Sequence, residues 1–236
     1  MEKEIAILMA AGLGTRMAPL TQKVPKPLVK AHGRSMISTV IDGLEQRGVE
    51  HIYIVVGYLG EQFRYLTEEY PNVSIIENKE YTVKNNISSI FAASEVMKTA
   101  NCFICEADLF VSDPSIFTAK LDRSCYYGKM VNGYSDDWVF DLDDKGIITR
   151  VGKCGTDTYN MVGVSYFRQK DAEIIANAVQ EAYQHEGHEQ LYWDEIVDQQ
   201  LEKLQLVINE VTADQIVEID SVAELEEFDP DYAKYN

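Results

Sequence analysis

The first half of the chain alternates between short apolar runs and longer amphipathic segments. The apolar runs predict buried strands at residues 4–9, 51–57, 73–78 and 102–110. The amphipathic segments, in which apolar residues recur with helical spacing, predict helices at residues 35–48, 61–70 and 86–97. Strands that alternate with helices are typical of a mostly parallel sheet with helices on both faces. We therefore expect an α/β fold in this half.

The pattern changes after residue 120. Longer strand-like segments separated by turns appear, and "DDKG" at 143–146 predicts a hairpin turn. The elements expected after them are helices at about 169–185 and 190–203, strands near 205–210 and 215–219, and a short helix after Asp220. Since no linker or repeat interrupts the chain, we expect one domain over residues 1–236, whose second half adds a small antiparallel lid.

Composition and charge narrow the classes of partner. The chain has 236 residues and a net charge of −18, which argues against a nucleic acid or an anionic membrane as the main partner. A local cluster of basic residues can still bind a small anion. No apolar run approaches the roughly 20 residues that span a bilayer, and "MEKEIAIL" leads directly into a strand, so we expect a cytoplasmic protein. The four cysteines predict reduced thiols and no disulfide framework.

A glycine loop follows the first predicted strand. Gly12 and Gly14 lie in "AAGLGTRMAPLTQKVPKPL", which lacks the Gly-Lys-Ser/Thr of a P-loop and has Met17 where a dinucleotide motif needs its third glycine. Glycines at the carboxyl end of a strand still let backbone N–H groups approach an anion. Arg16 and Lys26 add positive charge, so the loop predicts a phosphate site.

Two aspartates end apolar strands in the predicted sheet. Asp108 lies at the end of the predicted strand 102–110, on the same carboxyl edge as the glycine loop, and Asp220 follows the strand near 215–219. Each alone is more often a turn or helix-cap residue. A reaction between two phosphates needs a divalent metal, and Mg²⁺ prefers carboxylates together with phosphate oxygens. The two aspartates are therefore candidate ligands for Mg²⁺, and Glu106 and Glu218, each two residues earlier, are expected beside them.

Aromatic residues gather in two polar segments of the second half. "GYSDDWVFD" contains Trp138, and "QLYWDEIV" contains Tyr192 and Asp194. Packing in the core or at its rim is the commoner role of such side chains. The functional alternative is an aromatic box, because a quaternary ammonium donates no hydrogen bonds and is recognised by aromatic faces and a nearby carboxylate.

The order of residues 8–28 resembles the N-terminal signature of the nucleotidyltransferases that activate sugar phosphates and alcohol phosphates. Within that superfamily the chain is most similar to bacterial choline-phosphate cytidylyltransferases. The matching stretches are "VGYLGEQFRYL", "NNISS", "EADLF", "DDWVF", "VGVSYF", "LYWDEIV" and "EIDSV". The resemblance implies a Rossmann-like nucleotidyltransferase fold with a nucleotide-binding part at about 1–120, a C-terminal metal strand at about 204–236 and an acceptor-binding part at about 121–203.

The resemblance also implies roles for individual residues. The nucleotide would be held by Ala10, Ala11, Gly12, Leu13, Gly14 and Thr15, and its cytosine would lie near Asn85, Asn86 and Ser88. Arg16 would grip the triphosphate, Lys26 would neutralise charge across the reacting phosphates, and Asp108 and Asp220 would hold Mg²⁺. Trp138, Tyr192 and Asp194 would bind choline, and Lys153 would contact the acceptor phosphate.

These residues lead to the reaction CTP + phosphocholine → CDP-choline + pyrophosphate. A phosphate monoester is already an oxyanion at neutral pH, so the reaction needs no side-chain nucleophile. Other acceptors stay open, namely 2-aminoethylphosphonate, phosphoethanolamine or a polyol phosphate. The first two carry a primary amine, which would prefer carboxylates such as Asp194 or Asp137. A sugar 1-phosphate and a non-catalytic nucleotide-binding module are less favoured. The sequence leaves monomer and homodimer open.

Overall fold

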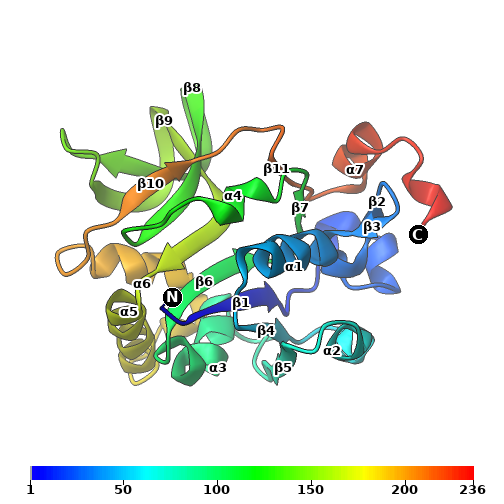
Figure 1. The fold of residues 1–236 in the computed structure, drawn as a ribbon, viewed down its shortest axis with the longest axis horizontal. Helices are drawn as coiled ribbons and strands as arrows, with labels where there is room; N and C mark the ends of the chain where they lie inside the picture. Colours follow the sequence, from blue (N-terminus) through cyan, green and yellow to red (C-terminus); the bar gives the residue numbers. More distant parts are fainter. Residues whose placement is uncertain (1) are drawn as a thin grey trace.

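The computed structural model describes residues 2–236, so Met1, the first residue of the expected domain, lies outside the described residues. A seven-stranded sheet runs through the molecule in the order β10-β8-β9-β6-β1-β4-β5 (Figure 1). Its parallel part consists of β1 (Glu4–Ala10), β4 (His51–Val56), β5 (Val73–Glu77) and β6 (Asn101–Glu106). This confirms the expected α/β fold with a mostly parallel central sheet.

Helices cover both faces of this sheet because side chains alternate along its buried strands. Ala6 and Leu8 of β1 point into the core shared with α1 (Met36–Arg47), α2 (Tyr65–Glu69) and α4 (Ser115–Thr118). Ile5 and Ile7 point into the opposite core, which is covered by α3 (Ile87–Met97), α5 (Gln169–Ala182) and α6 (Trp193–Gln199). The carboxyl ends of β1, β4 and β6 therefore open at one edge between these layers, where α/β sheets bind ligands.

The antiparallel part continues the same sheet. The long strands β8 (Cys125–Leu142) and β9 (Ile148–Phe167) form a hairpin, and β9 pairs with β6. Gly146 N–H donates to Asp143 C=O at 2.9 Å, which confirms the predicted turn. β10 (Val207–Glu210) adds the outer edge, in parallel to β8. The expected lid is thus a curled extension of the central sheet.

A break in the chain after β6 brings distant carboxylates together. The sequence predicts one strand over 102–110, whereas β6 ends at Glu106 and β7 (Leu109–Val111) leaves the main sheet to pair with β11 (Ile216–Glu218). Its antiparallel register sets Leu109 opposite Glu218. Asp108 therefore lies beside the segment that carries Glu218 and Asp220, before α7 (Val222–Phe228) begins.

Most predicted elements lie within a few residues of their expected bounds. The largest differences are that the 61–70 segment begins as a 3₁₀ turn before α2, and that the helix expected at 190–203 is confined to Trp193–Gln199. The two-stranded ribbon of β2 (Lys30–Ala31) and β3 (Arg34–Ser35) carries no strong pattern in the sequence. Among residues 2–236, no helix has the length and apolar character needed to cross a membrane.

Candidate active site

The glycine loop leaves β1 at the open edge of the sheet. Gly14 has a φ of 62°, and a Cβ there would lie 2.8 Å from the Cβ of Lys26, so this position needs glycine. Around Gly12 no atom lies within 4 Å of such a Cβ, which leaves its backbone open to the adjoining cavity. Within the loop, Gly14 therefore packs tightly against Lys26, whereas the backbone of Gly12 is accessible from the cavity.

Two cations and two aspartates form a closed cluster behind the loop. Lys26 Nζ donates to Asp108 Oδ2 at 2.6 Å and to Asp220 Oδ1 at 2.5 Å, and Arg16 Nη1 donates to Asp220 Oδ2 at 2.7 Å. Burial by itself lowers the pKa of Lys26, but the adjacent aspartates outweigh it, and the net pKa is raised. Lys26 therefore stays charged at neutral pH in a nearly buried position.

Two glutamates add negative charge to this cluster. Oxygen atoms of Glu106, Asp108 and Glu218 lie within 4.8 Å of one another. Burial, followed by the charges of Asp108 and Asp220, raises the pKa of Glu218 to about 8, and burial also raises the pKa of Glu106. With Asp220, these carboxyl groups lie beside the two cations Arg16 and Lys26. An all-oxygen donor set, whose crowding raises the pKa of its glutamates when no cation is bound, suits a hard divalent cation such as Mg²⁺.

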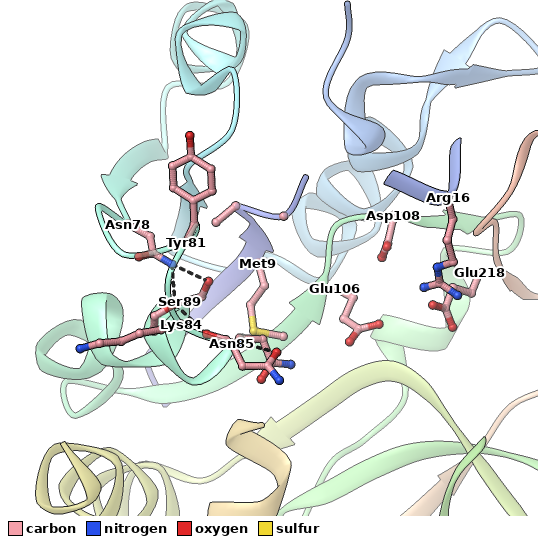
Figure 2. Close-up of a pocket in the computed structure, with 14 residues that line it drawn as sticks. Met9, Arg16, Asn78, Tyr81, Lys84, Asn85, Ser89, Glu106, Asp108 and Glu218 are labelled. Carbon is pink, nitrogen blue, oxygen red and sulfur yellow. Dashed lines mark hydrogen bonds between the residues drawn. The ribbon is translucent and has the colours of Figure 1, made fainter. Parts of the chain in front are cut away.

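A cavity of about 280 Å³ extends from these carboxylates along the glycine loop. Figure 2 shows Asp108, Glu106 and Glu218 near Arg16 at one end, and Asn78, Tyr81 and Lys84 at the other. A second cavity of about 240 Å³ is lined by Lys26, Ala10, Gly14, Thr15, Pro27 and Asp220, and it shares Met9, Gly12, Arg16 and Asp108 with the first. The two cavities therefore meet at the carboxylate cluster.

The residues expected near a base lie at the far end of the first cavity. Asn85, Asn86 and Ser88 line it together with Ala11. Asn85 Nδ2 donates to Gln190 C=O at 3.2 Å, and Asn86 Oδ1 accepts from Trp193 N–H at 3.0 Å. This segment therefore lines the cavity and also anchors the start of α6. Leu13 is exposed on the loop and lines neither cavity.

The residues expected for the acceptor fall into two places. The rings of Trp138 and Tyr192 contact edge to face, with centroids 5.4 Å apart, and Lys153 Nζ lies 5.7 and 5.3 Å from the two centroids. Asp194 is buried instead. It accepts a hydrogen bond from the Tyr126 hydroxyl at 3.0 Å and lines a small cavity with Glu106. Burial raises the pKa of Asp194 to about 7.

Several cavity residues were not predicted from the sequence. Asn78 comes directly after β5, at the same edge as the glycine loop, and its Nδ2 donates to Ser88 Oγ at 2.9 Å and Ser89 Oγ at 3.2 Å. Its position after a parallel strand is a signal that could have identified it. Tyr81 and Lys84 lie in the following loop, whose irregular sequence gives no comparable signal.

Comparison with known proteins agrees with this geometry. Residues 6–131 match the family model described as the MobA-like NTP transferase domain. The chain is 56% identical, over 98% of its length and 94% of the relative, to 2-aminoethylphosphonate cytidylyltransferase of Lancefieldella rimae. It is 32% identical, over 92% of its length and 93% of the relative, to choline-phosphate cytidylyltransferase of Streptococcus pneumoniae.

A solved structure extends the likeness to three dimensions. CTP:phosphocholine cytidylyltransferase from Streptococcus pneumoniae matches with a TM-score of 0.88 and 30% identity, covering 97% of this chain and 98% of that one. The resemblance found in the sequence is thereby confirmed at the level of family and fold.

Proposed function

We propose a specific reaction for this chain, which belongs to the nucleotidyltransferase family that carries the MobA-like NTP transferase domain. The reaction is transfer of CMP from CTP to 2-aminoethylphosphonate, with release of pyrophosphate. The observation that carries the choice of acceptor is the contrast in identity. The sequence identity is 56% to the 2-aminoethylphosphonate enzyme and 32% to the choline-phosphate enzyme, over nearly the same span of the chain.

The nucleotide would occupy the two connected cavities. Their volumes of about 280 and 240 Å³ meet at the carboxylates, so a base at the Asn85–Ser88 end leaves the phosphates beside the loop. Backbone N–H groups from Ala10 to Thr15 would approach phosphate oxygens there. Arg16 and Lys26 are the cations within reach of these phosphates.

Catalysis would rest on positioning and electrostatics. A phosphonate oxyanion needs no side chain to remove a proton, and the described cavities contain neither a Ser–His pair nor a cysteine in such a role. Lys26 and Arg16 would balance the negative charge that gathers on the departing pyrophosphate. Asp108 and Asp220, with Glu106 and Glu218 beside them, would hold Mg²⁺, which when bound would offset charge on the α-phosphate and orient it.

The acceptor would enter from the side of β8, β9 and α6. A primary ammonium has three N–H donors and prefers carboxylates as partners. Asp137, exposed beside Trp138 on β8 and near enough to Glu218 for its charge to raise that group's pKa, offers such a partner. Phosphocholine is the second candidate, and the Trp138–Tyr192 pair is the observation that favours it.

A direct assay separates these acceptors. Pyrophosphate release would be followed with CTP and Mg²⁺ in the presence of 2-aminoethylphosphonate, phosphoethanolamine or phosphocholine, with UTP as the control nucleotide. We expect the highest kcat/KM with CTP and 2-aminoethylphosphonate. A higher kcat/KM with phosphocholine would overturn the choice of acceptor, and no release with any pair would overturn the reaction.

A further inference from the structure

The aromatic pair at the acceptor side already has a cation. Trp138 on β8 and Tyr192 at the start of α6 touch edge to face at 5.4 Å, a separation at which aromatic rings are in direct contact. No cation therefore fits between the two rings as they stand. The position over both faces is taken by Lys153 Nζ, 5.7 Å from the Trp138 centroid and 5.3 Å from the Tyr192 centroid. Both distances lie within the range of about 6 Å for a cation–π contact.

The backbone fixes Lys153 in this place. Lys153 is directly opposite Trp138 in the pairing of β8 with β9, so the two side chains share one face of the hairpin. Arg150 donates to Lys153 C=O at 3.3 Å and to Cys154 C=O at 2.9 Å. The same guanidinium is held by Asp141 through contacts of 2.6 and 3.0 Å. The two aromatic rings are thus the partners of the Lys153 ammonium.

A second cation cannot easily bind over these rings, because Lys153 already occupies the position and repels another positive charge. A quaternary ammonium depends on aromatic faces because it donates no hydrogen bonds, so it has to displace Lys153 or lie beside a like charge. A primary ammonium can instead donate its three N–H groups to oxygen acceptors, so it does not depend on the aromatic faces. Lys153 therefore weakens binding of a quaternary-ammonium acceptor more than binding of a primary-amine acceptor.

We infer that Lys153 is a specificity-determining residue whose ammonium occupies the cation site of the Trp138–Tyr192 pair and so disfavours quaternary-ammonium acceptors relative to primary amines. The inference rests on the proposed cytidylyl transfer to 2-aminoethylphosphonate. It concerns the ratio of two activities and gives the aromatic pair a partner from the chain itself.

The test is the ratio of kcat/KM for phosphocholine to kcat/KM for 2-aminoethylphosphonate, measured with CTP for the parent enzyme and three variants. Lys153→Met keeps an unbranched side chain and removes the charge, Lys153→Arg keeps the charge, and Lys145→Met changes an exposed lysine on the hairpin turn. We expect Lys153→Met to raise the ratio by about fivefold or more, which is the scale of an exposed cation–π contact plus the removed repulsion. Lys153→Arg and Lys145→Met should leave the ratio near that of the parent.

Each other outcome has a definite meaning. An unchanged ratio in Lys153→Met would overturn the inference. An equal fall of kcat/KM for both acceptors would also overturn it, because Lys153 would then bind the acceptor's phosphate or phosphonate. If the parent enzyme used neither acceptor with CTP, the proposed function itself would fail, and this failure is visible before any variant is compared.

Discussion

Asp194 provides a pH-dependent test of the site's electrostatics. The residue is 3% exposed, and burial raises its pKa from 3.8 to about 7 even though the hydrogen bond from Tyr126 acts in the opposite direction. The folded protein therefore keeps a proton on Asp194 at pH values where the unfolded chain has lost it. Stability from this group is fully present below about pH 4 and is lost as pH rises toward 7.

The size of the effect follows from the shift. A pKa difference of one unit corresponds to about 1.4 kcal/mol, so between pH 5 and pH 8 the parent should lose about 2.5 kcal/mol of unfolding free energy through Asp194. Asp194→Asn keeps an acceptor for Tyr126 and has no proton to lose. The difference in unfolding free energy, variant minus parent, should therefore increase by up to about 2.5 kcal/mol across this range.

Urea denaturation at pH 5, 6, 7 and 8 measures this difference. Asp144→Asn, on the exposed hairpin turn, is the matched control, and its difference from the parent should stay constant. A difference for Asp194→Asn that stays equally constant from pH 5 to pH 8 would refute the assignment of a buried, protonated carboxyl group.

Three further predictions concern the carboxylate cluster and the core. Asp108→Asn should lower kcat for pyrophosphate release by about a hundredfold or more with an unchanged circular dichroism spectrum, and a near-normal kcat would contradict its role. Lys26→Met should lower kcat/KM by a similar factor. It should also destabilise the fold by about 3 kcal/mol, because Asp108 and Asp220 lose their buried partner. An unchanged melting temperature in thermal unfolding would contradict this second effect. Gly43→Ala ordinarily favours a helix, but a Cβ there lies 2.5 Å from the Phe117 ring, so urea titration should show a loss of about 1–3 kcal/mol and not a gain.

The sequence predicts the parallel half well because its elements have strong local patterns. β1, α1, β4 and α3 each combine a clear period with an end signal, such as Gly48 after α1. The break of 102–110 into β6 and β7 was not predicted, because the apolar run continues through Ala107 and only the pairing with β11 reveals it. Pairing between residues as distant as Leu109 and Glu218 leaves no trace in local spacing.

In the candidate site, too, residues within sequence motifs can be predicted, whereas contacts that depend on tertiary packing cannot. Arg16, Lys26, Asp108 and Asp220 were found from motif and resemblance, and the structure brings them into one cluster. The close approach of Glu218 to Asp108, and the burial of Asp194 beneath the cavity, depend on tertiary packing.

The resemblance implies that Lys153 contacts an acceptor phosphate, which stays a prediction, and the structure places its ammonium over two aromatic rings. A register between two long curled strands decides this placement, and such a register cannot be derived from composition or period alone.

We propose that this enzyme joins CMP to 2-aminoethylphosphonate. The most direct measurement is ³¹P NMR of a reaction that contains the purified protein, CTP, Mg²⁺ and equal concentrations of 2-aminoethylphosphonate and phosphocholine. We expect the phosphonate resonance to be consumed first, giving a phosphonate–phosphate anhydride and pyrophosphate. Preferential consumption of the phosphocholine resonance would contradict it.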